Sequence, residues 1–309
     1  MKAPVQRAPR RAVHGVLLLD KGVGLSSNHA LQRAKRLLRA EKAGHTGTLD
    51  PLASGLLPLC FGAATKFSQF SLDADKRYTA TLCLGATTTT GDLEGDLVAR
   101  RDERPDRAAL DAVIARFTGP ITQVPPMHSA LKHEGRALYE YAREGIDVVR
   151  APRSVTILGL DVVSWQGDVL TLDVRCTKGT YVRTLAEDIG AALGCGAHLS
   201  SLRRTGSGAL SLDDAVTLDA LVQMSPAERD ARLCAPDVLL ADWPLWRLSA
   251  VEAARFLTGL RRRVASADAP HVRVYGPENR ALLGAAHISA GELIPDRLLS
   301  PAEVQALLH

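Results

Sequence analysis

One carboxylate stands in a stretch that is otherwise rich in glycine and proline. Residues 44–58 read GHTGTLDPLASGLLP and contain a single acidic residue, Asp50. Pro51 fixes its own φ angle and favours an extended conformation for Asp50. Neutral polar residues, His45 among them, flank the carboxylate. We expect a stiff loop that presents Asp50 for nucleophilic or proton-transfer chemistry, although an Asp-Pro turn between two elements would have the same sequence.

A second group of reactive residues lies further along the chain, behind a predicted hairpin. Alternating residues at 155–163 and 169–176 indicate two strands joined by a tight turn. Residues 178–190, KGTYVRTLAEDIG, then predict a glycine turn and a helix that Thr180 caps. Arg183 would lie in the first turn of this helix, where a cation opposes the helix dipole. A carboxylate bound to Arg183 would explain its position, and a salt bridge at the surface is the alternative.

The elements that must position these groups mix strands and helices. Residues 15–21 form an apolar run typical of a buried strand, and the polar run 26–28 would cap a helix that ends near residue 39. Residues 78–84 alternate apolar and polar side chains, with Tyr78 first on the apolar face. We also expect a loop at 87–92, a helix capped by Asp106 and ending near 117, and short helices at 217–240.

Length and composition favour a globular protein with one large and one small domain. Of the 309 residues, 46% are hydrophobic and only 4% are aromatic. So few rings argue against a protein that binds long single strands by stacking many bases. The five cysteines lack CxxC spacing and predict neither a disulfide framework nor a zinc site. Since the sequence shows no secretory signal and no run of about 20 apolar residues, we expect a cytoplasmic protein that does not enter a membrane.

The charge of the chain is unevenly distributed. Residues 1–66 carry 11 lysines and arginines against 3 acidic residues, whereas the whole chain has a net charge of only +4. Residues 1–14 would form a disordered basic arm. The region around Asp50 is therefore basic and suits a polyanionic partner, although a solvated basic face would have the same composition.

Three dispersed motifs resemble those of one family, in the same order. Residues 44–58 are similar to the signature of the TruB family, the bacterial tRNA pseudouridine-55 synthases. KGTYVRT at 178–184 resembles the family's KGTYIRT, and CGAHLSSLRRT at 195–205 resembles its next motif. The resemblance implies an enzyme that isomerises the T-loop uridine at position 55 of tRNA to pseudouridine.

The resemblance also implies roles for individual residues. Asp50 would be the catalytic residue, acting at C1′ of the ribose or on the C2′ proton, and Arg183 would pair with it. Tyr78 would stack on the flipped uracil, and His45 would fill the gap that the base leaves in the RNA. The other implied substrate-binding residues are Tyr181 and Leu202 in the base pocket, and Lys21, Lys66 and Arg203, with Arg204 as the alternative to Arg203 for a phosphate contact.

The implied fold class is α+β. Residues 15–242 would form a pseudouridine synthase catalytic domain, with a mostly antiparallel central sheet flanked by helices. Residues 245–309 would form a small C-terminal PUA-like β-barrel that binds RNA. We expect a monomer that contacts the T-arm and elbow of tRNA and uses no cofactor or metal. At Gly22, Thr89 and His128 the family more often has proline, aspartate and tyrosine.

Two other functions remain open from the sequence. The protein could bind or fold RNA with catalysis as a secondary property. It could instead be an unrelated hydrolase in which His45 and Asp50 act as a catalytic pair, but that hypothesis leaves the basic N-terminal third unexplained.

Overall fold

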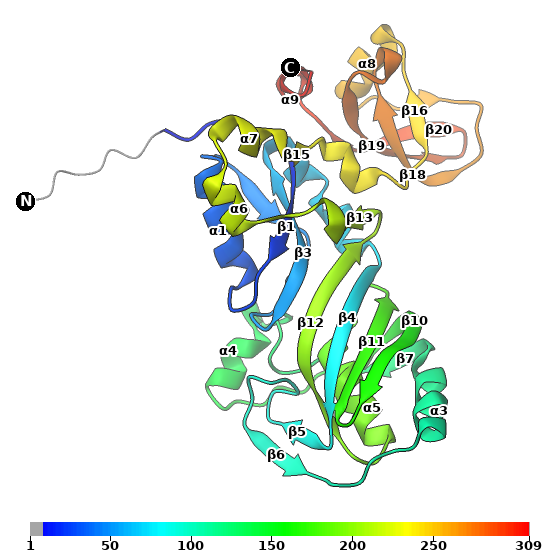
Figure 1. The fold of residues 1–309 in the computed structure, drawn as a ribbon. Helices are drawn as coiled ribbons and strands as arrows, with labels where there is room; N and C mark the ends of the chain where they lie inside the picture. The colour runs from blue at the N-terminus through cyan, green and yellow to red at the C-terminus, as the bar shows by residue number, and fades with distance from the viewer. Residues whose placement is uncertain (1–8, 309) are drawn as a thin grey trace, which may run out of the picture.

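Two β-sheets of unequal size dominate the structure, a computed structural model that describes residues 9–308. The larger sheet runs along the lower body, and the smaller one sits beyond its upper end (Figure 1). Residues 1–8 of the predicted basic arm lie outside the described residues. No helix between residues 9 and 308 combines the length and the hydropathy needed to cross a membrane.

The larger sheet has 11 strands and is mostly antiparallel. Its main path has the order β14-β1-β3-β12-β4-β11-β10-β7, in which the β1–β14 and β3–β12 pairs are parallel. The strands of this sheet are β1 (Gly15–Lys21), β2 (Ala43–His45), β3 (Ala53–Phe61), β4 (Lys76–Leu84), β7 (Gly119–Gln123), β10 (Arg153–Gln166), β11 (Val169–Cys176), β12 (Ala197–Ser207), β13 (Leu210–Ser211), β14 (Val216–Thr217) and β15 (Leu233–Cys234).

Helices cover one face of this sheet in two groups, each with its own buried apolar cluster. One cluster lies around β1 and β3, and the other around β4, β10 and β11. Tyr78 and Leu202 contact both clusters and therefore mark the seam between them. The first group is α1 (Ser27–Leu37) with α6 (Leu218–Gln223), and the second is α3 (Arg107–Phe117) with α5 (Val182–Ala192).

Shorter elements complete the larger body. They are η1 (Gly62–Lys66), α2 (Ser68–Asp73), β5 (Ala86–Thr88), β6 (Leu97–Arg100), β8 (Lys132–His133), β9 (Arg136–Ala137), α4 (Leu138–Arg143), η2 (Leu212–Asp214), α7 (Pro226–Ala231) and η3 (Pro236–Leu240).

The C-terminal sheet has five strands in the order β16-β18-β19-β20-β17. Tyr275 and Leu282 of this part share a buried cluster with Val16 and Leu18 on the far face of the larger sheet, so an apolar interface joins the two bodies. The elements are β16 (Leu245–Arg247), α8 (Ala250–Leu257), β17 (Arg262–Arg263), β18 (Ala269–Tyr275), η4 (Pro277–Asn279), β19 (Leu282–Ser289), β20 (Glu292–Leu298) and α9 (Pro301–Ala306).

Two local predictions about helices are wrong. Thr180 does not cap α5: its hydroxyl donates to the Thr177 carbonyl at 2.9 Å, and Tyr181 occupies the N-cap position without a side-chain cap. The C-terminal part, predicted as a small β-barrel with no helix singled out at its start, also contains α8. Ser249 and Glu252 begin that helix with a capping box.

Two segments predicted to be irregular are ordered. Residues 86–88 form β5, which pairs with β6, so the polar run at 87–92 is only partly a loop. At the N-terminus, the Arg11 amide donates to the Arg39 carbonyl at 2.8 Å and Val13 is buried. The described end of the predicted disordered arm is therefore packed on α1 and its neighbours.

Candidate active site

The loop that carries Asp50 joins β2 to β3 and is anchored on both sides of the carboxylate. On one side, the Ser27 hydroxyl accepts from the Leu49 amide at 2.8 Å and donates to the Leu49 carbonyl at 3.0 Å. On the other, the Pro51 carbonyl accepts from the Gly24 amide at 2.8 Å. The backbone is thus held at the start of α1, while the Asp50 side chain remains 46% exposed.

Directly after this loop, β3 lies very close to β12. Gly55 has a φ of +98°, and a Cβ atom at this position would lie 2.3 Å from the Arg204 carbonyl oxygen. Only glycine tolerates this conformation and this approach together. The parallel pairing that follows places Leu202 and Arg204 of β12 beside the loop.

Arg183 lies in the first turn of α5, where a buried amide side chain replaces the missing cap. Gln123 of β7 accepts from the Tyr181 amide at 3.0 Å and donates to the Tyr181 carbonyl at 3.2 Å. From this fixed position, Arg183 Nη2 donates to Asp50 Oδ2, and Arg183 Nε lies 3.2 Å from Asp92 Oδ2. The cation that opposes the helix dipole therefore has two carboxylate partners, where one was expected.

Asp92 is a residue that the sequence did not single out, because it follows a run of threonines typical of a loop. It is 3% exposed, and its Oδ1 accepts from the Thr90 hydroxyl at 2.5 Å and from the Glu94 amide at 3.1 Å. These bonds fix the carboxylate against Arg183. Asp92 can therefore hold the guanidinium through Nε while Nη2 donates to Asp50.

A pocket of about 340 Å³ opens beside Asp50, at the seam between the two apolar clusters. Its floor is the face of the sheet where Tyr78 of β4 pairs directly with Arg204 of β12. Burial raises the pKa of the Tyr78 phenol, which is therefore neutral at physiological pH. The ring of Tyr78 and the side chain of Leu202 form the uncharged part of the pocket lining, beside the charged side chains of Lys76 and Arg204. Of the predicted site residues, Asp50, Tyr78, Tyr181, Arg183 and Leu202 all line it.

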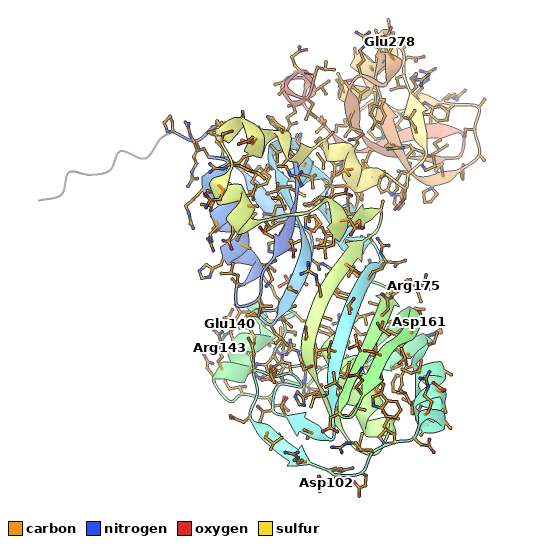
Figure 2. All side chains as sticks on the ribbon, in the orientation of Figure 1. Asp102, Glu140, Arg143, Asp161, Arg175 and Glu278 are labelled. Carbon is orange, nitrogen blue, oxygen red and sulfur yellow. The ribbon has the colours of Figure 1, made fainter. Side chains whose placement is uncertain are left out.

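A second pocket, of about 510 Å³, lies on the other side of the carboxylate, so Asp50 and Arg183 line both. His45, His128 and Arg143 also line it, and Figure 2 shows Arg143 on α4. Burial, and then the charge of Arg204, lower the pKa of His45, and its Nδ1 has no hydrogen-bond partner among residues 9–308. In the same part of the chain no hydrogen bond joins His45 to Asp50, which counts against a His–Asp catalytic pair.

Three predicted substrate-binding residues line neither pocket. Lys21 is fully buried and its ammonium donates to two backbone carbonyls, so it is not presented to an RNA surface, contrary to expectation. Lys66 Nζ lies 2.6 Å from Glu303 Oε2 of α9. Arg203 Nη2 lies 2.8 Å from Asp20 Oδ2, although the Arg203 side chain remains 43% exposed.

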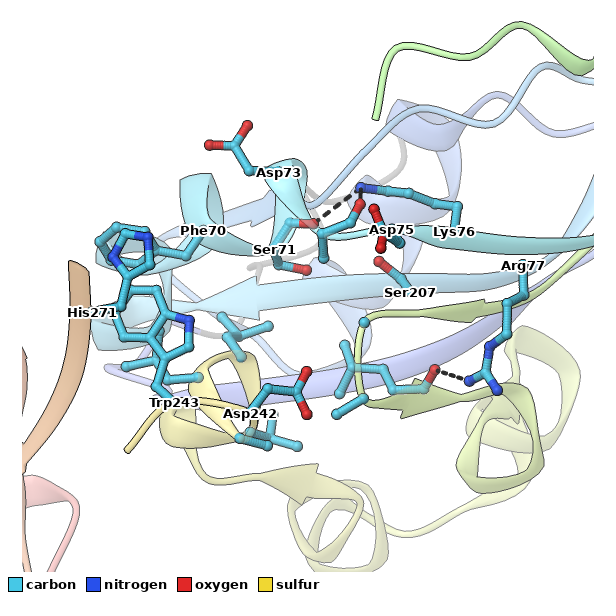
Figure 3. Close-up of a pocket in the computed structure, with 18 of the residues that line it drawn as sticks. Phe70, Ser71, Asp73, Asp75, Lys76, Arg77, Ser207, Asp242, Trp243 and His271 are labelled. Atoms are coloured by element: carbon cyan, nitrogen blue, oxygen red, sulfur yellow. Dashed lines mark hydrogen bonds between the residues drawn. The ribbon is translucent and has the colours of Figure 1, made fainter. Parts of the chain in front are cut away.

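A further pocket, of about 560 Å³, lies at the junction of the two bodies and contains none of the predicted catalytic residues. Trp243 and His271 stack there with ring centroids 4.3 Å apart, and Phe70 packs against the tryptophan (Figure 3). Lys76 lines both this pocket and the one beside Asp50.

Comparison with known proteins identifies the family. Residues 35–182 match the family model described as "TruB family pseudouridylate synthase (N terminal domain)". Residues 183–240 match "tRNA pseudouridylate synthase B C-terminal domain", and residues 244–299 match "Pseudouridine synthase II TruB, C-terminal". A tRNA pseudouridine synthase B of Burkholderia mallei is 59% identical over 304 residues, which span 96% of this chain and 97% of that protein. The chain belongs to the TruB family.

Membership of the TruB family makes the chain a tRNA pseudouridine synthase, an isomerase that acts on tRNA. A further relative with the same name, from Verminephrobacter eiseniae, is 57% identical over 98% of this chain and 93% of its own length. The family predicted from the motifs is therefore confirmed.

Solved structures confirm the fold class. A chain from the "Structure of H/ACA RNP bound to a substrate RNA containing 2'-deoxyuridine" has a TM-score of 0.73 at 23% identity, over all of this chain and 94% of that one. A chain of the archaeal box H/ACA Nop10–Cbf5 complex has a TM-score of 0.71, also at 23% identity, over 93% of this chain and 86% of that one. The shared architecture is a mixed α+β body with a large central sheet and a smaller C-terminal sheet.

Proposed function

We propose that this TruB-family enzyme converts the T-loop uridine at position 55 of tRNA to pseudouridine, with Asp50 as the catalytic carboxylate. One observation carries the proposal: a half-exposed carboxylate on an anchored loop lies where two pockets meet, bound by a buried arginine. One pocket would take the base, while the other would hold the RNA strand that leads to it.

The base must first leave its stack, because a paired or stacked uridine cannot reach Asp50. The uracil would enter the smaller pocket and lie on the Tyr78 ring, with Leu202 and Tyr181 excluding water around it. Exclusion of water matters, since a base detached from its ribose would otherwise be lost as in a hydrolase. His45, in the second pocket, would fill the space that the base vacates.

Asp50 would then act on the ribose of the flipped nucleotide. Its carboxylate either attacks C1′ or removes the proton from C2′, and the N-glycosidic bond breaks in both routes. The uracil turns within the pocket, C5 bonds to C1′, the C5 proton is lost and N1 gains a proton. Arg183, held by Asp92, would keep the Asp50 carboxylate aimed at the sugar.

The division of labour along the chain is part of the same proposal. Residues 15–242 would carry the chemistry, and residues 245–309 would contribute RNA contacts as a PUA-like domain. Exposed basic residues such as Arg203 would contact phosphates of the T-arm and elbow. We expect a monomer that works in the cytoplasm, where its tRNA substrate is found.

The proposal is tested by incubating the purified protein with unmodified tRNA, and separately with a T-arm hairpin, and mapping pseudouridine at nucleotide resolution. We expect one pseudouridine, at position 55, in both RNAs. Pseudouridine elsewhere in the tRNA would contradict the site assignment. Tight binding without any pseudouridine would instead favour an RNA-folding role, and released uracil would favour a hydrolase.

A further inference from the structure

Two buried cations, Lys76 and Arg204, line the pocket beside Asp50 without a carboxylate of their own, and Lys21, which does not line it, is a third buried cation of this kind. Lys21, Lys76 and Arg204 are 0%, 7% and 1% exposed, and within the described chain none of them forms an ion pair. Each donates instead to backbone carbonyls. Burying charge without a counter-ion costs stability, so such a cluster calls for an explanation in the function.

Arg204 is one of the two buried cations without a carboxylate partner that line the base pocket. It lines that pocket, pairs with Tyr78 across β12 and β4, and donates from Nε to the Leu56 carbonyl at 2.6 Å. Its Nη2 is buried and makes no hydrogen bond to any residue between 9 and 308. Lys76 lines the same pocket, and its Nζ donates to the carbonyls of Ser71 and Ala74 (Figure 3). It also donates to the carbonyl of Leu72 in α2.

Lys76 and Arg204 line the same pocket. Burial, and then the nearby charge of Arg204, lower the pKa of Lys76 to about 8. Arg183, the other cation of the site, is neutralised by Asp50 and Asp92. The uncompensated positive charge is therefore on the floor of the pocket, under the place where the base would lie.

We propose that Arg204, assisted by Lys76, stabilises the negative charge that develops on the uracil when it leaves the ribose. This inference rests on the proposed function and assigns the stabilisation of the leaving group, a role that Asp50 cannot fill because its charge is negative. A fixed cation in a site without water stabilises developing charge far more than the same cation in water.

The step is balanced as follows. The C1′–N1 bond breaks and its electron pair stays on N1, from which it spreads onto O2 and O4 of the ring. The electron-poor C1′ is satisfied by a bond to Asp50, or by loss of the C2′ proton to Asp50 with formation of a C1′–C2′ double bond. After the base turns, an electron pair at C5 forms the new bond to C1′ while the C1′–Asp50 bond breaks, or while Asp50 returns its proton to C2′ of the double bond. With uridine, the C5 proton is then lost and N1 gains a proton, so Asp50 ends as a free carboxylate. The cations are unchanged throughout.

The test compares two T-arm hairpins, one with uridine and one with 5-fluorouridine at the target position. Fluorine withdraws electrons and stabilises a uracil anion by itself, so a base that carries it depends less on an external cation. Loss of the N-glycoside is measured under single-turnover conditions at saturating RNA, by digestion to nucleosides. The variants are Arg204→Met, Arg204→Lys and Lys76→Met, with Arg203→Met on the opposite face of β12 as the matched control.

We expect Arg204→Met to slow the reaction of the uridine hairpin by about 10²- to 10³-fold, the usual loss for one stabilising donor. The loss with the 5-fluorouridine hairpin should be at least tenfold smaller. Lys76→Met should show the same selectivity with a smaller loss, and Arg204→Lys should retain more activity than Arg204→Met. Arg203→Met should leave the ratio of the two rates at the wild-type value, whatever its effect on binding.

Equal losses with the two hairpins would overturn the inference and leave Arg204 with a structural role. If circular dichroism shows that Arg204→Met does not fold, Lys76→Met tests the inference instead, through the ratio of its rates with the uridine and 5-fluorouridine hairpins. A wild-type protein that isomerises neither hairpin would contradict the proposed function, and this outcome is distinct from a failure of the Arg204 inference.

Discussion

Arg183 Nε lies 3.2 Å from Asp92 Oδ2, and the same guanidinium donates to Asp50 through Nη2. The proposed catalytic carboxylate, Asp50, is therefore positioned through a buried arginine by a second carboxylate, Asp92, which is itself fixed by its own turn. The side chain of Asp92 is 4% exposed and holds Arg183, whereas the side chain of Asp50 is 46% exposed and stays accessible to a substrate.

Replacing Asp92 with alanine should reduce both stability and turnover. The change leaves buried Arg183 with one partner, and breaking a buried pair by removing one member costs about 3–5 kcal/mol. Chemical denaturation measures the stability and single-turnover kinetics the rate. Asp96→Ala, an exposed residue four positions later, is the control and should change neither. An Asp92→Ala variant as stable and as fast as Asp96→Ala would mean that Arg183 does not need its second partner.

Replacing Tyr78 with leucine should slow the chemical step more than it weakens tRNA binding. The ring offers stacking to a flipped base, which is worth about 1–3 kcal/mol, so we expect a loss of roughly 10- to 100-fold in the single-turnover rate. Tyr141→Leu is the matched control, because the ring of this α4 residue contacts His133 and Arg136 and lines neither pocket beside Asp50. Weaker binding with an unchanged rate at saturating tRNA would exclude the stacking role.

The buried lysine at position 76 should make stability depend on pH above neutrality. Burial, the main cause, lowers the pKa of Lys76 from 10.5 to about 8 in the folded protein. Between these values the unfolded chain binds more protons than the folded one, so the free energy of unfolding rises with pH. The contribution is at most about 1.4 kcal/mol per pH unit.

The measurement compares urea denaturation of the wild type and Lys76→Met from pH 7.5 to 10.5. The difference in stability between the two proteins should favour Lys76→Met most at the low end and shrink as the pH rises. A difference that stays constant over this range would show that Lys76 does not titrate there, and would contradict the lowered pKa of this buried lysine.

The sequence predicted the parts of the site that have a local signal. Asp50 stands out as one acid in a run of glycine and proline, and Arg183 as a cation in an unfavourable turn of a helix. Asp92 carries no such signal, because its importance comes from a fold that brings residues 50, 92 and 183 together. Burial of Lys21 is likewise a tertiary effect. The sequence around a lysine at the end of an apolar strand does not reveal whether its ammonium faces RNA or donates to backbone carbonyls.

The sequence alone could have shown that Arg204, rather than Arg203, faces the pocket. In a strand, residues two apart share a face, so placing Leu202 in the pocket also places Arg204 there and turns Arg203 away. The C-terminal part was predicted less well, because its short strands carry weak patterns. Its apolar contacts with Val16 and Leu18 could not be predicted from the sequence. Because of these contacts, deleting residues 245–309 would expose part of the core of the larger body.

The central claim is that Asp50 performs the chemistry, and Asp50→Asn tests it most directly. The amide keeps the size of the side chain and its place in the loop but cannot act as a nucleophile or a base. We measure pseudouridine formation at position 55 under single-turnover conditions, together with tRNA affinity. The account predicts near-wild-type affinity and a rate less than about a hundredth of wild type. A variant that retains more than this while folded and saturated with tRNA would contradict the account.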